Sequence, residues 1–384
     1  MKRFAALLLT VALLLSLCGC GGKSDTFLAD YDQLWVDLEE NYPFFPVLKE
    51  KGVDAQAIRE EYRSYVEGTE TVEEFMDVLD VMFGKLMNFA HLSLIRRERY
   101  DLLVEAMARN TDGSFAPWSA VLTDPVTAER YASFPEPEAA QSQGEAEVVC
   151  RYYPFHKAAY FQFPAMTPFG EDSDETLIAD YLAKLPKVEH IIIDITGNGG
   201  GSTAYWRDVI VRPFGGTWSG SYPVYYQDSP INRIYYAERD LLPLAQAGED
   251  VKHPSFAKQL NAAFVEEARW GADFGAPTVT KGADAKRWVL TDGRGYSAAE
   301  QFAAFCKMTG WATLVGSSTG GDGLSGNPLL LRLENTGLLV YLSTAMAANP
   351  DGTLNAERGV SPDYHSAKEK MTPLALCLQL IVEQ

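Results

Sequence analysis

The chain contains few cysteines, few histidines and too few basic residues to balance its acidic ones. Its 384 residues include 5 cysteines and 5 histidines, and no two cysteines have CxxC spacing. The sequence therefore indicates neither a zinc site nor a dithiol redox centre, and we expect no metal and no cofactor. Lys and Arg number 33 against 52 Asp and Glu, which gives a net charge of −19. Such a surface repels phosphate backbones, so we expect no nucleic-acid partner.

Long apolar runs are also absent, with one exception at the N-terminus. Basic residues precede the apolar run Phe4–Leu17, and Cys20 follows it after a cysteine and a glycine. This arrangement resembles a bacterial lipoprotein signal peptide, and the run is shorter than the about 20 residues of a transmembrane helix. We expect a signal peptide over 1–19, lipidation (palmitate) of Cys20, a tether over 20–26, and attachment to the extracytoplasmic face of a bacterial cell membrane. The alternatives are a plain secretory peptide and a membrane anchor.

No segment has low complexity. Hydrophobic residues make up 47% and charged residues 22% of the chain, which is typical of a globular protein of two or three domains. Apolar residues at helical spacing, such as Leu34, Trp35 and Leu38, predict an N-terminal helical domain over 27–100. The weakly patterned stretch 101–147 predicts a connector or a surface insertion.

Strands and helices alternate over 148–384, which predicts an α/β core. The run His190–Asp194 is almost wholly apolar, as expected for a strand that is covered on both faces. The other expected elements are strands at 158–163, 288–291 and 312–316, a helix from Ser297 to Met308, and a hairpin formed by 329–334 and 338–343.

A glycine-rich segment, Asp194–Gly201, begins at the end of the apolar strand. Glycine allows a sharp turn there and leaves backbone N–H groups free to face a ligand. The segment lacks the lysine of a Walker loop and the glycine spacing of the dinucleotide-binding fingerprint. Taken alone, it indicates a tight strand-to-helix turn.

Ser297 stands where a strand and a glycine-containing turn lead into a helix. A serine at that place commonly caps the helix, and Glu300 completes the pattern of a capping box. The alternative is a nucleophile, because a helix N-terminus stabilises negative charge that develops in front of it. Taken alone, the serine is better explained as a cap.

Four segments in this order resemble the C-terminal-processing (tail-specific) serine peptidase family, which includes the tricorn core and the interphotoreceptor retinoid-binding protein. They are Asp194–Gly201, Ser297–Glu300, Val315–Gly321 and Glu357–Asp363. The resemblance implies an α/β (α+β) fold with a crotonase- or Clp-protease-like ββα core and an N-terminal helical domain. It also implies a serine peptidase that hydrolyses a peptide or protein substrate, with Ser297 as the nucleophile.

The branches of this family differ in the base that activates the serine. In the processing branch a lysine follows Thr-x-Gly, but Asp322 occupies that position here, and a carboxylate cannot replace the amine. The Ser–Lys mechanism is therefore excluded, and the stretch before the core is too short for that branch's usual PDZ domain. The tricorn-like branch uses a histidine instead, so the resemblance implies His91 as general base and Glu357 as the distal carboxylate.

The chain departs from the tricorn-like pattern at two further positions. Ala90 replaces the serine that precedes the histidine and bridges to the glutamate. Ser93 or a water must then substitute, or Glu357 must reach His91 directly. Thr196 stands where the family prefers arginine, which weakens the support of the turn.

The oxyanion hole is expected to use the backbone N–H groups of Gly200 and Ala298. Gly200 is preferred to Gly199 because family members often carry proline at the latter position, and proline has no N–H. We expect Asp194 and Asn198 to fix the turn rather than to act on the substrate.

Two other functions stay open at this point. An α/β-hydrolase could use the chain order Ser297, then Asp322 or Asp363, then His365, although the final glycine of the nucleophile elbow is missing. A non-enzymatic alternative is a catalytically degenerate family member that binds peptides or lipids.

Overall fold

The computed structural model describes residues 23–109, 116–136, 147–166, 171–237, 239, 241–252, 254–260 and 262–383. The expected signal peptide and Cys20 lie outside these residues. The first described helix, α2 (Lys23–Asn41), begins inside the stretch expected to be a tether. Within the described ranges, no helix combines the length and the apolar character needed to cross a membrane.

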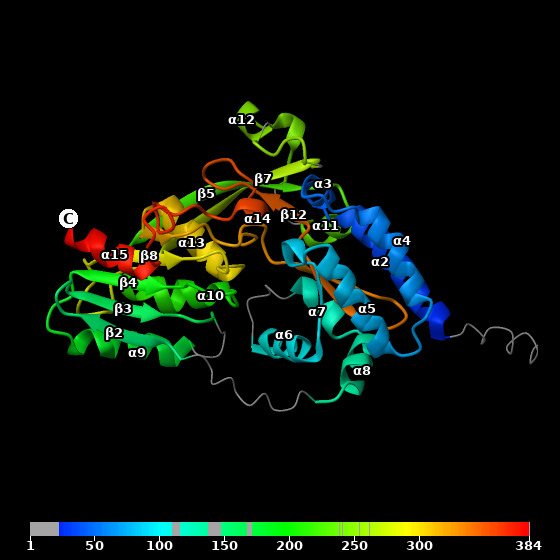
Figure 1. Cartoon of the computed structure of the whole chain (residues 1–384), viewed down its shortest axis with the longest axis horizontal. Helices are drawn as coiled ribbons and strands as arrows, with labels where there is room; N and C mark the ends of the chain where they lie inside the picture. Colours follow the sequence, from blue (N-terminus) through cyan, green and yellow to red (C-terminus); the bar gives the residue numbers. More distant parts are fainter. Residues whose placement is uncertain are drawn as a thin grey trace, which may run out of the picture.

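A six-stranded sheet forms one end of the molecule (Figure 1), with the strand order β13-β9-β8-β4-β3-β2. Its strands are β2 (Val149–Tyr153), β3 (Ala158–Gln162), β4 (His190–Asp194), β8 (Lys286–Thr291), β9 (Thr313–Gly316) and β13 (Tyr364–His365). All neighbours pair in parallel except β2 and β3, which are antiparallel. The predicted α/β core is therefore confirmed, and its parallel strands end at one common edge.

Helices cover both faces of this sheet, which explains the continuous apolar run of β4. Ile191 and Ile193 pack with α13 (Ala298–Thr309), the π-helix η2 (Trp206–Val211) and α9 (Glu171–Lys184). Ile192 faces the other way and packs with α15 (Pro373–Val382). Successive strand residues point to opposite faces, so a strand covered on both must be apolar throughout.

Two antiparallel sheets continue from the core. One has the order β12-β5-β7-β6 and is built from β5 (Thr217–Tyr226), β6 (Leu242–Pro243), β7 (Phe264–Asp273) and β12 (Ala345–Ala347). The other has the order β1-β11-β10, from β1 (Ser93–Leu94), β10 (Leu329–Arg332) and β11 (Leu339–Leu342). The second sheet contains the predicted hairpin, and β1 joins it to the end of the N-terminal helices.

The N-terminal helices share their core with that hairpin. They are α2, α3 (Phe45–Glu50), α4 (Ala55–Val66) and α5 (Val72–Lys85). Their buried residues form one cluster with Leu331, Val340 and Met346. The buried carboxylate of Asp30 accepts hydrogen bonds from the backbone N–H groups of Asn335 and Thr336, at 2.9 and 2.7 Å. The helices therefore fix the segment that follows them relative to the rest of the fold.

The stretch 101–147, for which the sequence predicted a connector or a surface insertion, is largely helical in the residues that the structure describes. Helices α6 (Arg97–Arg109), α7 (Ala116–Leu122) and α8 (Pro125–Ser133) occupy most of them. Tyr100, Leu103 and Trp118 pack with Leu330 and Tyr341 of the hairpin in a cluster of their own. These helices are short, and their apolar faces are matched by strands more than two hundred residues away in sequence, so local periodicity did not reveal them.

A buried carboxylate joins α13 to the loop after β9 and to the short helix α14 (Asn355–Arg358). Glu300 is fully buried, and its Oε2 accepts from the N–H of Gly321 at 3.2 Å. Its Oε1 accepts from Asn355 Nδ2 at 2.6 Å. Burial raises the pKa of Glu300 to about 7, although these hydrogen bonds oppose the rise.

We predict that Glu300 makes the protein less stable as the pH rises from about 4.5 to about 7. Over this interval the folded state keeps the Glu300 proton while the unfolded state has released it, so the free energy of unfolding falls with rising pH. The fall is roughly 3 kcal/mol, since one pKa unit corresponds to about 1.4 kcal/mol. Urea unfolding at several pH values, for wild type and Glu300→Gln, measures it.

The unfolding free energy of wild type minus that of Glu300→Gln should fall across this interval and stay constant above it. Glu40→Gln, at an exposed position on α2, is the matched control and should show no such trend. A difference between wild type and Glu300→Gln that does not change with pH would contradict the prediction.

Candidate active site

Ser297 sits at the junction of β8 and α13 in a conformation that a helix cap does not adopt. Its φ is 55° and its ψ is −118°, and its side chain makes no capping hydrogen bond. Glu300 does not cap either, because its carboxylate is bound to Gly321 and Asn355. The capping interpretation is therefore wrong. A left-handed φ at a residue other than glycine costs about 1–3 kcal/mol, and such strain persists where a site requires it.

The glycine segment packs directly against this serine. A Cβ atom at Gly200, whose φ is +99°, would lie 2.9 Å from Ser297 Cβ and 2.6 Å from the carbonyl oxygen of Tyr296. Only glycine fits this close approach. The turn between β4 and α10 (Thr203–Tyr205) is thereby pressed onto the start of α13.

Asp194 and Asn198 fix the turn, as expected. Asp194 Oδ1 accepts from both the N–H and the hydroxyl of Thr196, at 2.8 and 2.7 Å, and Asp194 Oδ2 accepts from the hydroxyl of Tyr160. Asn198 donates to the carbonyl oxygen of Phe163 at 2.8 Å. Thr196 thus supports the turn in the place where the family prefers arginine.

His91 ends a strained turn that follows α5. Met87, Asn88, Ala90 and His91 all have positive φ. The N–H of His91 donates to the hydroxyl of Tyr296 at 3.0 Å, and the carbonyl oxygen of Ala90 accepts from the N–H of Ser343 at 2.9 Å. The backbone of the turn is therefore held by the residue before Ser297 and by the strand end after β11.

The carboxylate that contacts His91 is Asp322. Its Oδ2 lies 2.5 Å from His91 Nδ1, and its side chain is fully buried. The hydroxyls of Ser343 and Ser325 donate to its two oxygens at 2.8 and 2.9 Å. Burial alone raises the pKa of Asp322, but the electrostatic effect of the neighbouring His91 and the hydrogen bonds from His91, Ser343 and Ser325 outweigh it and lower this pKa below its ordinary value. An ionised carboxylate only accepts hydrogen bonds, so Nδ1 carries the proton.

The expected contact between Glu357 and His91 is not formed, and this assignment is corrected. Glu357 Oε1 lies 3.4 Å from Lys51 Nζ, at the end of α3. Ser93 is no bridge either, because its hydroxyl donates to the carbonyl oxygen of His91 itself at 3.1 Å. Ser343 takes the bridging position instead: its Oγ is 3.4 Å from His91 Nδ1 and donates to Asp322. Asp322, in the loop after β9, thus contacts His91 in place of Glu357, and Ser343, directly after β11, bridges in place of a residue near His91.

The two expected oxyanion donors differ in what they bind. The N–H of Gly200 donates to Asn198 Oδ1 at 2.8 Å, so it is already engaged, and the expectation for Gly200 is corrected. The N–H groups of Ala298, Gly199 and Gly201 donate no hydrogen bond among those described for the chain. Asn198 precedes Gly200 by two residues, and this local side-chain-to-backbone bond is one that asparagine commonly forms.

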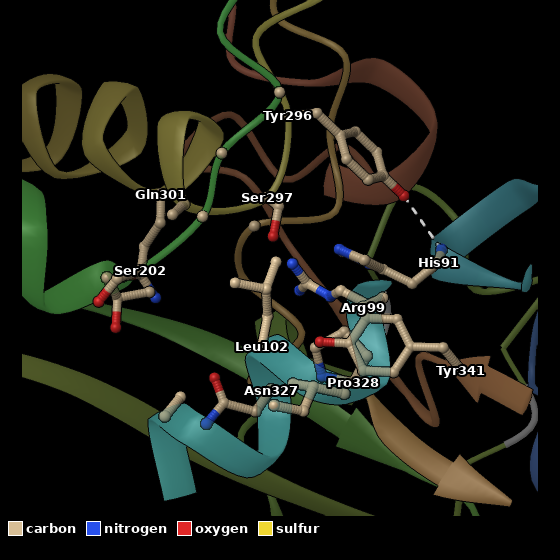
Figure 2. Close-up of a pocket in the computed structure, with 18 of the residues that line it drawn as sticks. His91, Arg99, Leu102, Ser202, Tyr296, Ser297, Gln301, Asn327, Pro328 and Tyr341 are labelled. Atoms are coloured by element: carbon tan, nitrogen blue, oxygen red, sulfur yellow. Dashed lines mark hydrogen bonds between the residues drawn. The ribbon is translucent and has the colours of Figure 1, made fainter. Parts of the chain in front are cut away.

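These residues meet in a cavity of about 850 Å³. It is lined by Ser297, His91, Asp322 and Gly199–Gly201, and by side chains of α6. Figure 2 shows Ser297 and His91 on two walls of this cavity, with both side chains directed into it. No hydrogen bond joins them in the described part of the chain, and Nδ1 of His91 is engaged by Asp322. Nε2 is therefore the nitrogen of His91 left to act in the cavity.

Other candidate residues lie elsewhere. The lining contains no lysine among the described residues, in keeping with the exclusion of a Ser–Lys pair. His365 Nε2 lies 3.4 Å from Ser361 Oγ, and Asp363 accepts from the N–H of Leu314, so neither joins Ser297 as an α/β-hydrolase would require. Where the chain is described, no group of three or more His, Cys, Asp or Glu side chains could hold a metal ion.

Comparisons with known proteins place this site in a family. Residues 157–366 match the model for peptidase family S41, and residues 24–84 match that for the tricorn protease C1 domain. A search of curated proteins found no match.

Two solved structures have the same fold. A peptidase candidate from Parabacteroides merdae is 17% identical, with a TM-score of 0.54 and coverage of 92% of this chain and 95% of its own. Mature CPAF in complex with lactacystin is 14% identical, with a TM-score of 0.50 and coverage of 93% and 97%. The fold is thus the Clp-protease-like core with an N-terminal helical region, as the resemblance implied. Because the S41 match spans more than half of the chain, the protein belongs to peptidase family S41, the tail-specific protease family, and is a serine-type peptidase that acts on peptides or proteins.

Proposed function

We propose that Ser297, His91 and Asp322 form the catalytic triad of this peptidase. The observation that carries the proposal is the 2.5 Å contact between His91 Nδ1 and the buried carboxylate of Asp322, at a cavity that Ser297 also lines. A histidine held in this way presents Nε2, with its lone pair, to the serine. The strained backbone at all three residues supports the same assignment, since each has a positive φ.

The reaction follows from these positions. Ser297 Oγ attacks the carbonyl carbon of the scissile peptide bond while His91 Nε2 takes the hydroxyl proton. The resulting imidazolium is stabilised by Asp322, and it then gives its proton to the leaving amine, which leaves an acyl-enzyme. A water molecule attacks the ester in the same manner and restores the free serine.

The oxyanion of the tetrahedral intermediate needs backbone donors near Ser297. We assign the N–H of Ala298, which lies at the N-terminus of α13 and has no acceptor among the described residues, as one donor. The second is an amide of the glycine segment, Gly199 or Gly201, because the N–H of Gly200 is engaged by Asn198. Losing one such donor typically costs about 100- to 1000-fold in rate.

The three departures from the family pattern each have a counterpart in the structure. Asp322 supplies a carboxylate to His91. Ser343 bridges where Ala90 cannot. Thr196 supports the glycine turn through Asp194. These contacts support catalysis over a purely peptide- or lipid-binding role.

We further propose that the enzyme works at the extracytoplasmic face of a bacterial cell membrane, anchored by lipid on Cys20. The support is the sequence alone: a basic start, a short apolar run and a cysteine directly after a glycine. Two acyl chains give stable anchoring, whereas a single chain binds only marginally.

We predict that a fluorophosphonate serine probe labels the detergent-solubilised protein at Ser297. Ser297→Ala should abolish labelling, because the nucleophile is gone. His91→Ala and Asp322→Asn should slow it by at least about 1000-fold, because the serine loses its base or the base loses its orientation. The rate of labelling, followed by gel fluorescence or mass spectrometry, measures all of these effects.

Glu357→Gln is the matched control for Asp322→Asn, since both replace one carboxylate by an amide. It should label within a few-fold of wild type, because Glu357 pairs with Lys51 and not with His91. Slow labelling in Glu357→Gln together with normal labelling in Asp322→Asn would contradict the triad. A folded wild-type protein that does not react would favour the binding role instead.

For the anchor, we expect the full chain expressed in a bacterial host to partition into the detergent phase of a Triton X-114 extract. Cys20→Ser should move it to the aqueous phase or leave it with an uncleaved signal peptide, and mass spectrometry should find the acyl groups on Cys20. Cys150→Ser, at a free cysteine within the fold, should not change the partition. Acylation elsewhere, or none, would refute this anchor.

A further inference from the structure

An arginine from α6 points into the catalytic cavity. Arg99 lies in the first turn of α6, near the end of the predicted helical domain, and lines the cavity with Ser297 and His91. Figure 2 shows its side chain directed into the space between the walls that carry these two residues. Its guanidinium carbon lies 5.9 Å from the ring centre of Tyr341, whose ring in turn packs edge-on against His91 at 5.6 Å. The ring of Tyr341 therefore lies next to both the guanidinium of Arg99 and the imidazole of the proposed base.

The charges in this cavity are unusual for the protein. Among the described lining residues the one carboxylate is Asp322, which is fully buried and held by His91. Arg99 and Arg207 of η2 line the same space, and neither has an ion-pair partner in the described part of the chain. The third lining arginine, Arg109, pairs with Glu105. The chain as a whole carries a net charge of −19, so this cavity is locally positive on an acidic protein.

A positive charge in the cavity favours a bound substrate that carries an anionic group. A guanidinium presents donors in a planar fork that matches a carboxylate, and hydrogen bonds between charged groups are stronger than those between neutral groups. Elsewhere on this protein the described arginines commonly meet carboxylates, as Arg63 does with Asp32 and Arg96 with Asp80. No carboxylate of the described residues plays that part at Arg99, which leaves the place to the substrate.

We infer that the peptide cleaved here carries a carboxylate close to the scissile bond, and that Arg99 binds it and so selects the substrate. This inference rests on the proposed function of the cavity. The carboxylate can come from an Asp or Glu side chain or from the free C-terminus of the peptide, and both present the same group to the guanidinium. Arg99 acts in binding and takes no part in the proton transfers.

The test uses the detergent-solubilised full chain and a library of quenched fluorescent peptides. Peptides that are cleaved are resynthesised in matched forms: Glu against Gln at each position beside the cleaved bond, and a free against an amidated C-terminus. Each form is measured with wild type, Arg99→Ala, Arg99→Glu and Arg233→Ala. Arg233 is an exposed arginine on α11 (Pro230–Tyr235) that pairs with Asp228 outside the cavity, so its replacement removes the same charge elsewhere.

We expect one matched change to lower kcat/KM of wild type by roughly 10- to 100-fold, the usual effect of losing a charged hydrogen bond. If Glu-to-Gln is that change, the carboxylate is a side chain; if amidation is, it is the C-terminus. Arg99→Ala should cleave both forms of the peptide with nearly the kcat/KM that wild type shows for the neutral form. Arg99→Glu should prefer the neutral form, and Arg233→Ala should behave as wild type.

Labelling by the serine probe distinguishes failure of the inference about Arg99 from failure of the proposed peptidase function. Normal labelling of Arg99→Ala shows a folded, reactive site, so a preference for the carboxylate that persists in this variant overturns the inference alone. So does a wild-type enzyme that cleaves charged and neutral forms equally. A wild type that neither labels nor cleaves overturns the proposed function and the inference with it.

Discussion

The proposed catalytic arrangement depends on one buried contact, the one between His91 and Asp322. The two residues are 231 positions apart in the chain, and the carboxylate is fully buried. Removing an ionised carboxylate from water costs several kcal/mol unless partners compensate. Here the imidazole and the hydroxyls of Ser343 and Ser325 provide that compensation, so the fold must bring three separate segments to one point.

Much of the architecture serves to hold these segments. The N-terminal helices share a core with the hairpin β10–β11 and so fix the turn of His91, while α13 and the Glu300 network fix Ser297 and the loop of Asp322. Among the described residues, eight other than glycine have positive φ, and Ser297, His91 and Asp322 are three of them. Strain of this kind is tolerated only where the surroundings over-determine the backbone, as the packing on all sides does here.

The sequence revealed those parts of the fold that have a local signature. The apolar run His190–Asp194 predicted a two-faced strand, and the glycine segment predicted the turn that Asp194 and Asn198 hold. It did not reveal α6, because its apolar side is matched by distant hairpin residues. The resemblance implied Glu357 as the acid, whereas Asp322 contacts His91, because which carboxylate reaches a histidine depends on the path of loops that a motif does not specify. Gly200 failed as a donor for a similar reason, since a neighbouring side chain took its N–H.

The most direct measurement of the central claim is proton NMR of the protein labelled with ¹⁵N-histidine. The Nδ1–H of His91, bonded to a buried carboxylate, should give a low-field resonance that is absent in His91→Ala. The account predicts that this resonance is lost or strongly shifted in Asp322→Asn and unchanged in Glu357→Gln. A resonance that survives unchanged in Asp322→Asn and disappears in Glu357→Gln would contradict it.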